Sequence, residues 1–216
     1  MSNMSVADVK LISYIRRELL LSRDMLNEIT RVLKSMDSID KEDSRERLEH
    51  IRSSKKDVET IQLDFLNYIS KISKGMTHRE DWLRVESKIS NITDKFSGIS
   101  YRLGFLLEKN WSVPRDILDK LTIISSTLDK MIQSLDIILV KTSEDPETAL
   151  KSIKNLSKIE SEIDFHYRDV LFTILDSNIS QSSMLLLLNI AEMLEESSDI
   201  LNDAANDLYI ILFDLV

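Results

Sequence analysis

The sequence of 216 residues contains no cysteine, three glycines and two prolines. The lack of cysteine excludes disulfides, thiolate zinc sites, iron–sulfur clusters and cysteine nucleophiles, and it fits a reducing cytoplasm. With so few glycines and prolines, the chain has no glycine-rich phosphate loop, no Gly-x-Gly-x-x-Gly nucleotide motif and no hairpin-dense β-fold. No serine stands in a Gly-x-Ser-x-Gly nucleophile elbow either. What remains is a long helical chain.

Positive charge is also in short supply. The 28 Lys and Arg stand against 37 Asp and Glu, which gives a formal net charge of −9 and a pI near 4.9. Such a balance argues against the broad basic surface that nucleic acid or an anionic membrane requires. The longest apolar runs, Met184–Leu188 and Leu208–Phe213, are far shorter than the roughly 20 residues of a membrane span. Because the N-terminus also lacks the pattern of a signal peptide, we expect a cytoplasmic protein that inserts nothing into a membrane and binds no nucleic acid.

Apolar residues recur at steps of three and four in six successive stretches of the chain, the pattern of one buried helix face. These stretches begin at Leu11, Ile51, Val85, Leu121, Ile153 and Leu187. Residues that typically start or end helices fall between the stretches: Ser5, Gly75, a capping box at Thr77–Glu80, Pro114, and Pro146 after the cap Asp145. The sequence therefore predicts an all-α fold of six helices of roughly 30–35 residues, with short connections that favour antiparallel neighbours.

The two halves of the chain align without a gap at an offset of 105 residues. At this offset Asp94 matches Asp199, and Leu103 matches Leu208. The alignment suggests two tandem three-helix bundles, residues 1–110 and residues 111–216. Any two amphipathic helices can be brought into apolar register, so the pattern alone does not separate an internal repeat from coincidence.

Acidic side chains recur at steps of four on the fifth and sixth predicted helices: Glu160 and Asp164, then Glu195, Asp199, Asp203 and Asp207. Residues four apart are neighbours on a helix surface, where like charges repel. If the two Glu-x-x-x-Asp pairs face each other across the bundle, their carboxylates can hold a divalent or trivalent cation. The alternative is a solvated acidic face, which is common in acidic helical proteins.

Histidine-based and aromatic sites have less support. A ferritin-like di-iron site needs an acid three residues before a histidine, and none of His50, His78 and His166 meets that condition. Trp82 and Trp111 are expected to anchor the ends of the bundle rather than to stack on a ligand.

The stretch Met76–Trp82, followed by Asp94 and by Tyr101–Leu103, resembles the PhoU-like phosphate transport regulator family, in its small branch associated with Pit-type transporters. The segment Arg79-Glu80-Asp81 is similar to a helix start common in that branch. In the second half, Glu160–Asp164 and Glu195–Asp199 resemble the two Glu/Asp-x-x-x-Asp motifs of the family. Length, helix order and tandem halves are similar over nearly the whole chain.

The resemblance implies two three-helix bundles and a non-enzymatic protein that regulates phosphate uptake beside a membrane phosphate transporter of the Pit type. It also implies a metal ion, such as iron or zinc, on the acidic motifs. The first half departs from the pattern, because Lys55 and Ser90 occupy two of the four acidic positions and only Glu59 and Asp94 remain. We therefore expect any metal in the second half, on Glu160, Asp164, Glu195 and Asp199 with Asp203 beside them.

Two other functions stay open at this point. One is a metal-dependent enzyme that uses the carboxylates of the fifth and sixth helices, and the other is a structural helical interaction module. The apolar run Ile210–Phe213 either closes the last bundle or forms the contact of a homodimer.

Overall fold

The computed structural model describes residues 4–36, 41–72 and 76–216. Within these residues the chain forms six α-helices and no strand, which confirms the predicted all-α class. Five helices have 30 residues and the last has 35, as the apolar stretches predicted. The helices are α1 (Val6–Ser35), α2 (Glu42–Lys71), α3 (Arg79–Glu108), α4 (Arg115–Glu144), α5 (Pro146–Leu175) and α6 (Gln181–Leu215).

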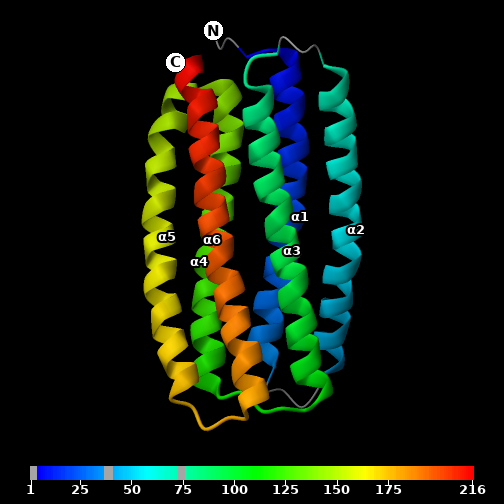
Figure 1. Ribbon diagram of the computed structural model, residues 1–216, viewed down its shortest axis with the longest axis vertical. Helices are drawn as coiled ribbons and strands as arrows, with labels where there is room; N and C mark the ends of the chain where they lie inside the picture. Colours follow the sequence, from blue (N-terminus) through cyan, green and yellow to red (C-terminus); the bar gives the residue numbers. More distant parts are fainter. Residues whose placement is uncertain (1–3, 37–40, 73–75) are drawn as a thin grey trace.

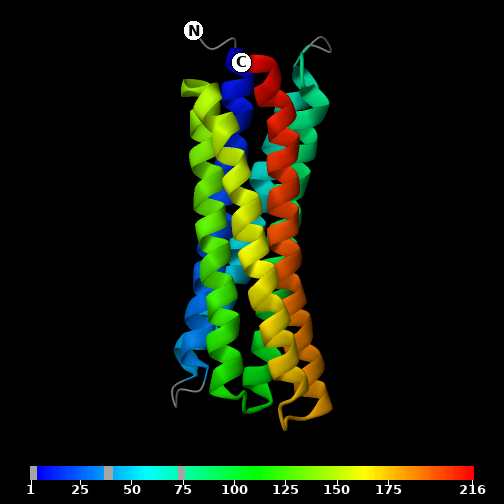
Figure 2. The ribbon, with the colours of Figure 1, turned by 90° about the vertical axis from the view of Figure 1, so that its left-hand side faces the viewer.

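The six helices lie side by side along one long axis, and helices that follow each other in the chain run antiparallel (Figure 1). Helices α1, α2 and α3 contact one another, and so do α4, α5 and α6. The two groups join through α1 against α4 and α3 against α6. Among the described helices, α2 and α5 contact only members of their own group. Seen from the side of α5, that helix covers the front of its group (Figure 2). The division at residue 110 stays a prediction, because one hydrophobic core runs through both groups.

Helix packing follows the apolar pattern of the sequence. The first residue of each of the six apolar stretches is buried, from Leu11 in α1 to Leu187 in α6. Burial of such side chains removes apolar surface from water at roughly 25 cal/mol per Å². The pattern of three and four therefore selects the faces that meet in the core.

Two helix starts match their sequence signals. The Ser5 hydroxyl accepts a hydrogen bond from the backbone N–H of Asp8, and the Asp8 carboxylate accepts one in return from the backbone N–H of Ser5. This reciprocal capping box satisfies two donors that a helix start leaves free. At α5 the Asp145 side chain accepts a hydrogen bond from the backbone N–H of Thr148, and Pro146 occupies the first helical turn as predicted.

The capping box predicted at Thr77–Glu80 is wrong. His78 rather than Thr77 precedes the helix, and it has a left-handed backbone with φ 60° and no side-chain cap. Its imidazole instead lies between two carboxylates, with Nδ1 3.0 Å from Asp81 and Nε2 3.2 Å from Asp214. His78 therefore contacts Asp81 of α3 and Asp214 of α6, and its side chain does not cap the helix.

The other prolines and glycines lie at different positions relative to the helices. Pro114 stands one residue before α4, at the cap position and not inside the first turn. Gly75 lies outside the described residues. Gly98 lies inside α3, where a Cβ atom would be 2.7 Å from Cε of Met193. The end of the Met193 side chain of α6 thus occupies the space that a larger residue at position 98 would need.

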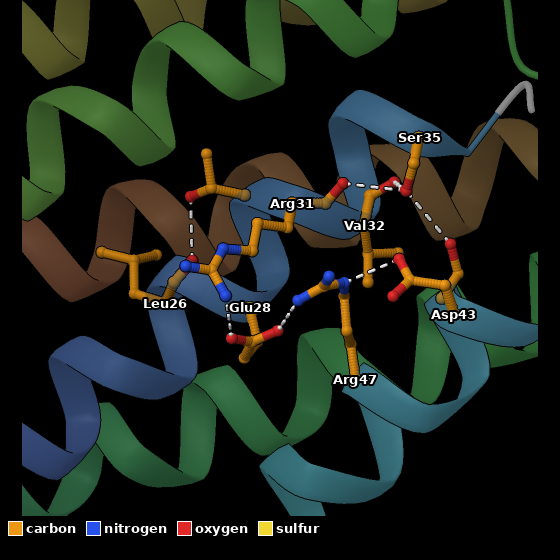
Figure 3. A network of polar contacts seen from close by, with 9 residues as sticks. Leu26, Glu28, Arg31, Val32, Ser35, Asp43 and Arg47 are labelled. Atoms are coloured by element: carbon orange, nitrogen blue, oxygen red, sulfur yellow. Dashed lines mark hydrogen bonds and ion pairs between the residues drawn. The ribbon is translucent and has the colours of Figure 1, made fainter.

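Polar contacts fix the end of α1 against the start of α2 (Figure 3). The Arg47 guanidinium donates to Glu28 of α1 at 2.7 Å and to Asp43 of its own helix at 2.8 Å. Arg31 donates to the other Glu28 oxygen at 2.7 Å. Both hydrogen bonds to carboxylates raise the pKa of Arg47, so this contact between α1 and α2 is charged throughout the physiological range.

The apolar run near the C-terminus divides between two environments. Ile211 and Leu212 are buried in the core, while Ile210 and Phe213 are exposed. The run therefore closes the last three-helix group with one face and presents the other face outward. No helix in the described part of the chain is both long and apolar enough to cross a membrane.

Candidate metal centre

Three of the predicted acidic residues meet between α5 and α6. Glu160 and Asp164 lie one turn apart on α5, and Asp199 faces them from α6. Each offers one carboxylate oxygen, and these oxygens all lie within 4.8 Å of one another. Glu160 and Asp164 are half-buried, whereas Asp199 is exposed. The arrangement suits an oxygen-ligated cation at a site open to solvent.

Burial and like charge raise the pKa values of the acids in and beside this cluster. Burial, followed by the negative charges of Asp199 and Asp164, raises the pKa of Glu195 to about 7. Burial and then the charge of Asp164 raise the pKa of Glu160, and the same two causes raise the pKa of Asp199. Like charges in a partly desolvated place favour the protonated forms. A bound cation would remove this repulsion, so the residues present fit a metal ion.

The neighbours of the cluster differ in how they interact with it. Arg168 donates to Asp164 at 3.3 Å from a largely exposed position. Asp203 lies one turn further along α6 and raises the pKa of Asp199, but it does not belong to the three converging carboxylates. Asp207, the last acid of the ladder, forms ion pairs with Lys88 at 2.7 Å and Arg84 at 3.3 Å. Along α6, Asp199 therefore belongs to the acidic cluster, whereas Asp207 connects α6 to α3 through ion pairs.

The corresponding place in the first half holds an ammonium group. Lys55, which aligns with Glu160, lies 2.8 Å from the Asp94 carboxylate. The hydrogen bond to Asp94, and after it the charges of Asp94 and Glu59, raise the pKa of Lys55. A side chain of the protein thus supplies the positive charge beside Asp94 and near Glu59. The role of Glu59 and Asp94 as metal ligands stays a prediction.

Two further acids escaped the sequence analysis. Glu18 on α1 and Glu86 on α3 are buried in the interior of the first three helices. The signal that could have found Glu18 is its place on the apolar stripe, three residues after Ile15 and four before the buried Ser22. An acid on a stripe that is otherwise buried has to lie in the core.

Comparison with solved structures identifies the fold of the chain. No protein-family model matches the chain, and no curated protein matches it by sequence. Solved structures do match. A PhoU-like protein from Shewanella oneidensis superposes with a TM-score of 0.79 at 13% identity, over 94% of this chain and 99% of the other. The chain has the PhoU-like fold.

Two further structures agree with that assignment. PhoU from Pseudomonas aeruginosa gives a TM-score of 0.73 at 17% identity, over 95% of this chain and 96% of the other. The phosphate transport system regulatory protein PhoU from Streptococcus pneumoniae gives 0.64 at 18% identity, over 97% and 99%. The PhoU-like fold thus extends over both three-helix groups and the α5–α6 face.

Proposed function

We propose that this chain is a non-enzymatic regulator of phosphate uptake that acts on a membrane phosphate transporter. The observation that carries the proposal is the match of almost the whole chain to a phosphate transport system regulatory protein. The Arg79-Glu80-Asp81 helix start and the acidic pairs of α5 and α6 support it. In finer detail, we propose a Pit-type transporter as partner, a cytoplasmic protein that reaches the membrane through that transporter, and a homodimer that uses the exposed Ile210 and Phe213.

The experiment for this proposal measures phosphate uptake by cells and the binding of a transporter to the tagged chain. Deleting the gene is expected to change the rate of phosphate uptake by whole cells, and the tagged chain is expected to retain a phosphate transporter from detergent-solubilised membranes. Unchanged uptake together with no retained transporter would contradict the proposal. A tagged chain that carries Glu160→Gln and Asp199→Asn, tested in parallel, separates transporter binding from metal binding.

As part of the same proposal, the carboxylates between α5 and α6 hold a divalent or trivalent metal ion. We assign Glu160, Asp164 and Asp199 as its ligands, because one carboxylate oxygen of each lies within 4.8 Å of the others. Glu195 lies near enough that the charges of Asp199 and Asp164 raise its pKa. An all-oxygen ligand set suits a hard ion such as iron(III), and zinc also accepts carboxylate oxygens. The ion would neutralise the cluster and tie α5 to α6.

Metal affinity at this cluster is expected to increase about tenfold from pH 6 to pH 8. A Glu195 carboxyl with a pKa of about 7 is mostly protonated at pH 6 and mostly ionised at pH 8, and a metal competes with that proton. Calorimetric titration with zinc at several pH values measures the trend. Glu195→Gln should flatten it, while Glu162→Gln, an exposed acid on α5, should leave it unchanged. Equal trends in both variants would disprove the role of Glu195.

A further inference from the structure

A pair of carboxyl groups lies inside the first three-helix group, away from the α5–α6 cluster. Glu18 on α1 is 0% exposed and Glu86 on α3 is 2% exposed. Within the described residues, both carboxyl oxygens of Glu18 and one of Glu86 have no hydrogen-bond partner. Buried polar atoms nearly always have partners, so these three carboxyl oxygens, none of which makes a well-formed hydrogen bond within the described residues, point to a ligand.

The two carboxyls are close enough to influence each other. Burial, followed by the negative charge of Glu86, raises the pKa of Glu18 to about 9. Burial raises the pKa of Glu86 to about 7. Two arginines of α1, Arg16 and Arg23, form ion pairs with Asp136 and Asp129 of α4. The Glu86 charge acts on Glu18 as a like charge, so the two carboxyls disfavour each other's ionised form.

Further oxygen-bearing side chains surround the pair from two helices. The Ser90 side chain on α3 lies near the Glu18 carboxyl and opposes the rise of its pKa. The Gln62 side chain on α2 acts on Glu86 in the same way. A side-chain amide carries an acceptor oxygen beside its donor nitrogen and can turn either one toward a ligand. The pair therefore lies between α1 and α3 with a third helix, α2, supplying an amide.

A small cavity lies beside the residues that surround the pair. A cavity of about 200 Å³ lies between α2 and α3, and both Gln62 and Ser90 line it. Its other polar lining residues are Lys55, Glu59, Thr93 and Asp94. Gln62 and Ser90 therefore belong both to the cavity wall and to the surroundings of the buried carboxyls, while Glu18 and Glu86 lie behind that wall.

We propose that Glu18 and Glu86 bind a divalent cation of the Mg²⁺ or Mn²⁺ class, with the side-chain oxygens of Gln62 and Ser90 as additional ligands. Two carboxylates balance the charge of one dication, which leaves a neutral unit in the core. Oxygen-only ligands select hard cations, and a site with few protein ligands suits an ion that keeps several waters. This site is separate from the α5–α6 cluster and does not depend on the regulatory role.

Titration with Mn²⁺ at pH 8 tests the proposal on the full chain. The starting protein carries Glu160→Gln and Asp199→Asn, which removes the other candidate site. We expect it to bind one Mn²⁺ per chain by calorimetry and by electron paramagnetic resonance. Adding Glu86→Gln should weaken this binding at least 100-fold. Adding Asp64→Asn instead, an exposed acid on α2 outside the cavity, should change it by a few-fold at most.

Two results would overturn the proposal: no Mn²⁺ bound to the starting protein, or full binding after Glu86→Gln. Circular dichroism establishes that each variant is folded, and Glu18→Gln replaces Glu86→Gln if the latter is not.

Discussion

Replacing Glu160 by Gln and Asp199 by Asn is expected to weaken iron or zinc binding between α5 and α6 on the order of 100-fold or more. Each substitution removes one charged ligand while keeping its shape, and each tenfold change in affinity corresponds to about 1.4 kcal/mol. Carboxylate oxygens within 4.8 Å of one another can bind one ion together, so removing two of the carboxylates should weaken metal binding strongly. Elemental analysis of purified protein and calorimetric titration measure the loss.

The first half of the chain offers a matched control for this experiment. Asp94 aligns with Asp199 but is bound to Lys55 at 2.8 Å, so Glu59→Gln with Asp94→Asn should leave the bound iron or zinc unchanged. In the absence of metal, Glu160→Gln with Asp199→Asn should also unfold at a higher temperature than the wild type, because the repulsion between the acids is gone. Equal metal loss in the two double variants would show that the α5–α6 cluster is not the site.

Trp82→Ala is expected to lower the free energy of unfolding by about 3–5 kcal/mol, the usual cost of deleting a large buried aromatic side chain. The Trp82 ring is 0% exposed. Its Nε1 donates to the Asp8 carboxylate at 2.8 Å, which connects the start of α3 to the start of α1. Domains are stable by about 5–15 kcal/mol in total, so the loss is a large part of the whole. Urea unfolding followed by circular dichroism measures it.

Trp111→Ala is the natural control, because the two tryptophans differ in burial and not in size. Trp111 is half-buried and packs edge-on against Phe105, with ring centroids 5.7 Å apart. Its removal should cost about 1–2 kcal/mol. Trp82→Phe keeps much of the buried ring and loses the hydrogen bond to Asp8, so it should fall between the two. If Trp82→Ala lowers the free energy of unfolding no more than Trp111→Ala does, the proposed contribution of Trp82 to stability is wrong.

The prediction that both tryptophans anchor bundle ends treated them alike, and the structure separates them. Trp82 follows the left-handed His78 and turns into the core, whereas Trp111 lies in the connection between α3 and α4. Sequence position near a helix end does not reveal which way the entering chain points. His78 takes its backbone conformation beside Asp81 and the distant Asp214, and a local capping rule cannot account for a contact with a residue far along the chain.

The features that the amino-acid sequence determined by itself depend on local interactions. Helix periodicity, the caps at Ser5 and Asp145 and the pair Glu160 and Asp164 depend on residues within one or two turns. The sequence is therefore sufficient to predict six long helices and which acids share a helix face. The resemblance to PhoU-like proteins pointed to the same fold that the solved structures show.

Only the tertiary structure decided which groups from different helices meet. The register of α6 against α5 brings Asp199 to Glu160 and leaves Asp203 outside. The packing of α2 against α3 joins Lys55 to Asp94, and the packing of α1 against α3 buries Glu18. A shift of one residue along a helix moves a side chain by 1.5 Å and turns it by about 100°. Contacts between helices therefore depend on the packing of the whole core, which no single stretch of sequence encodes.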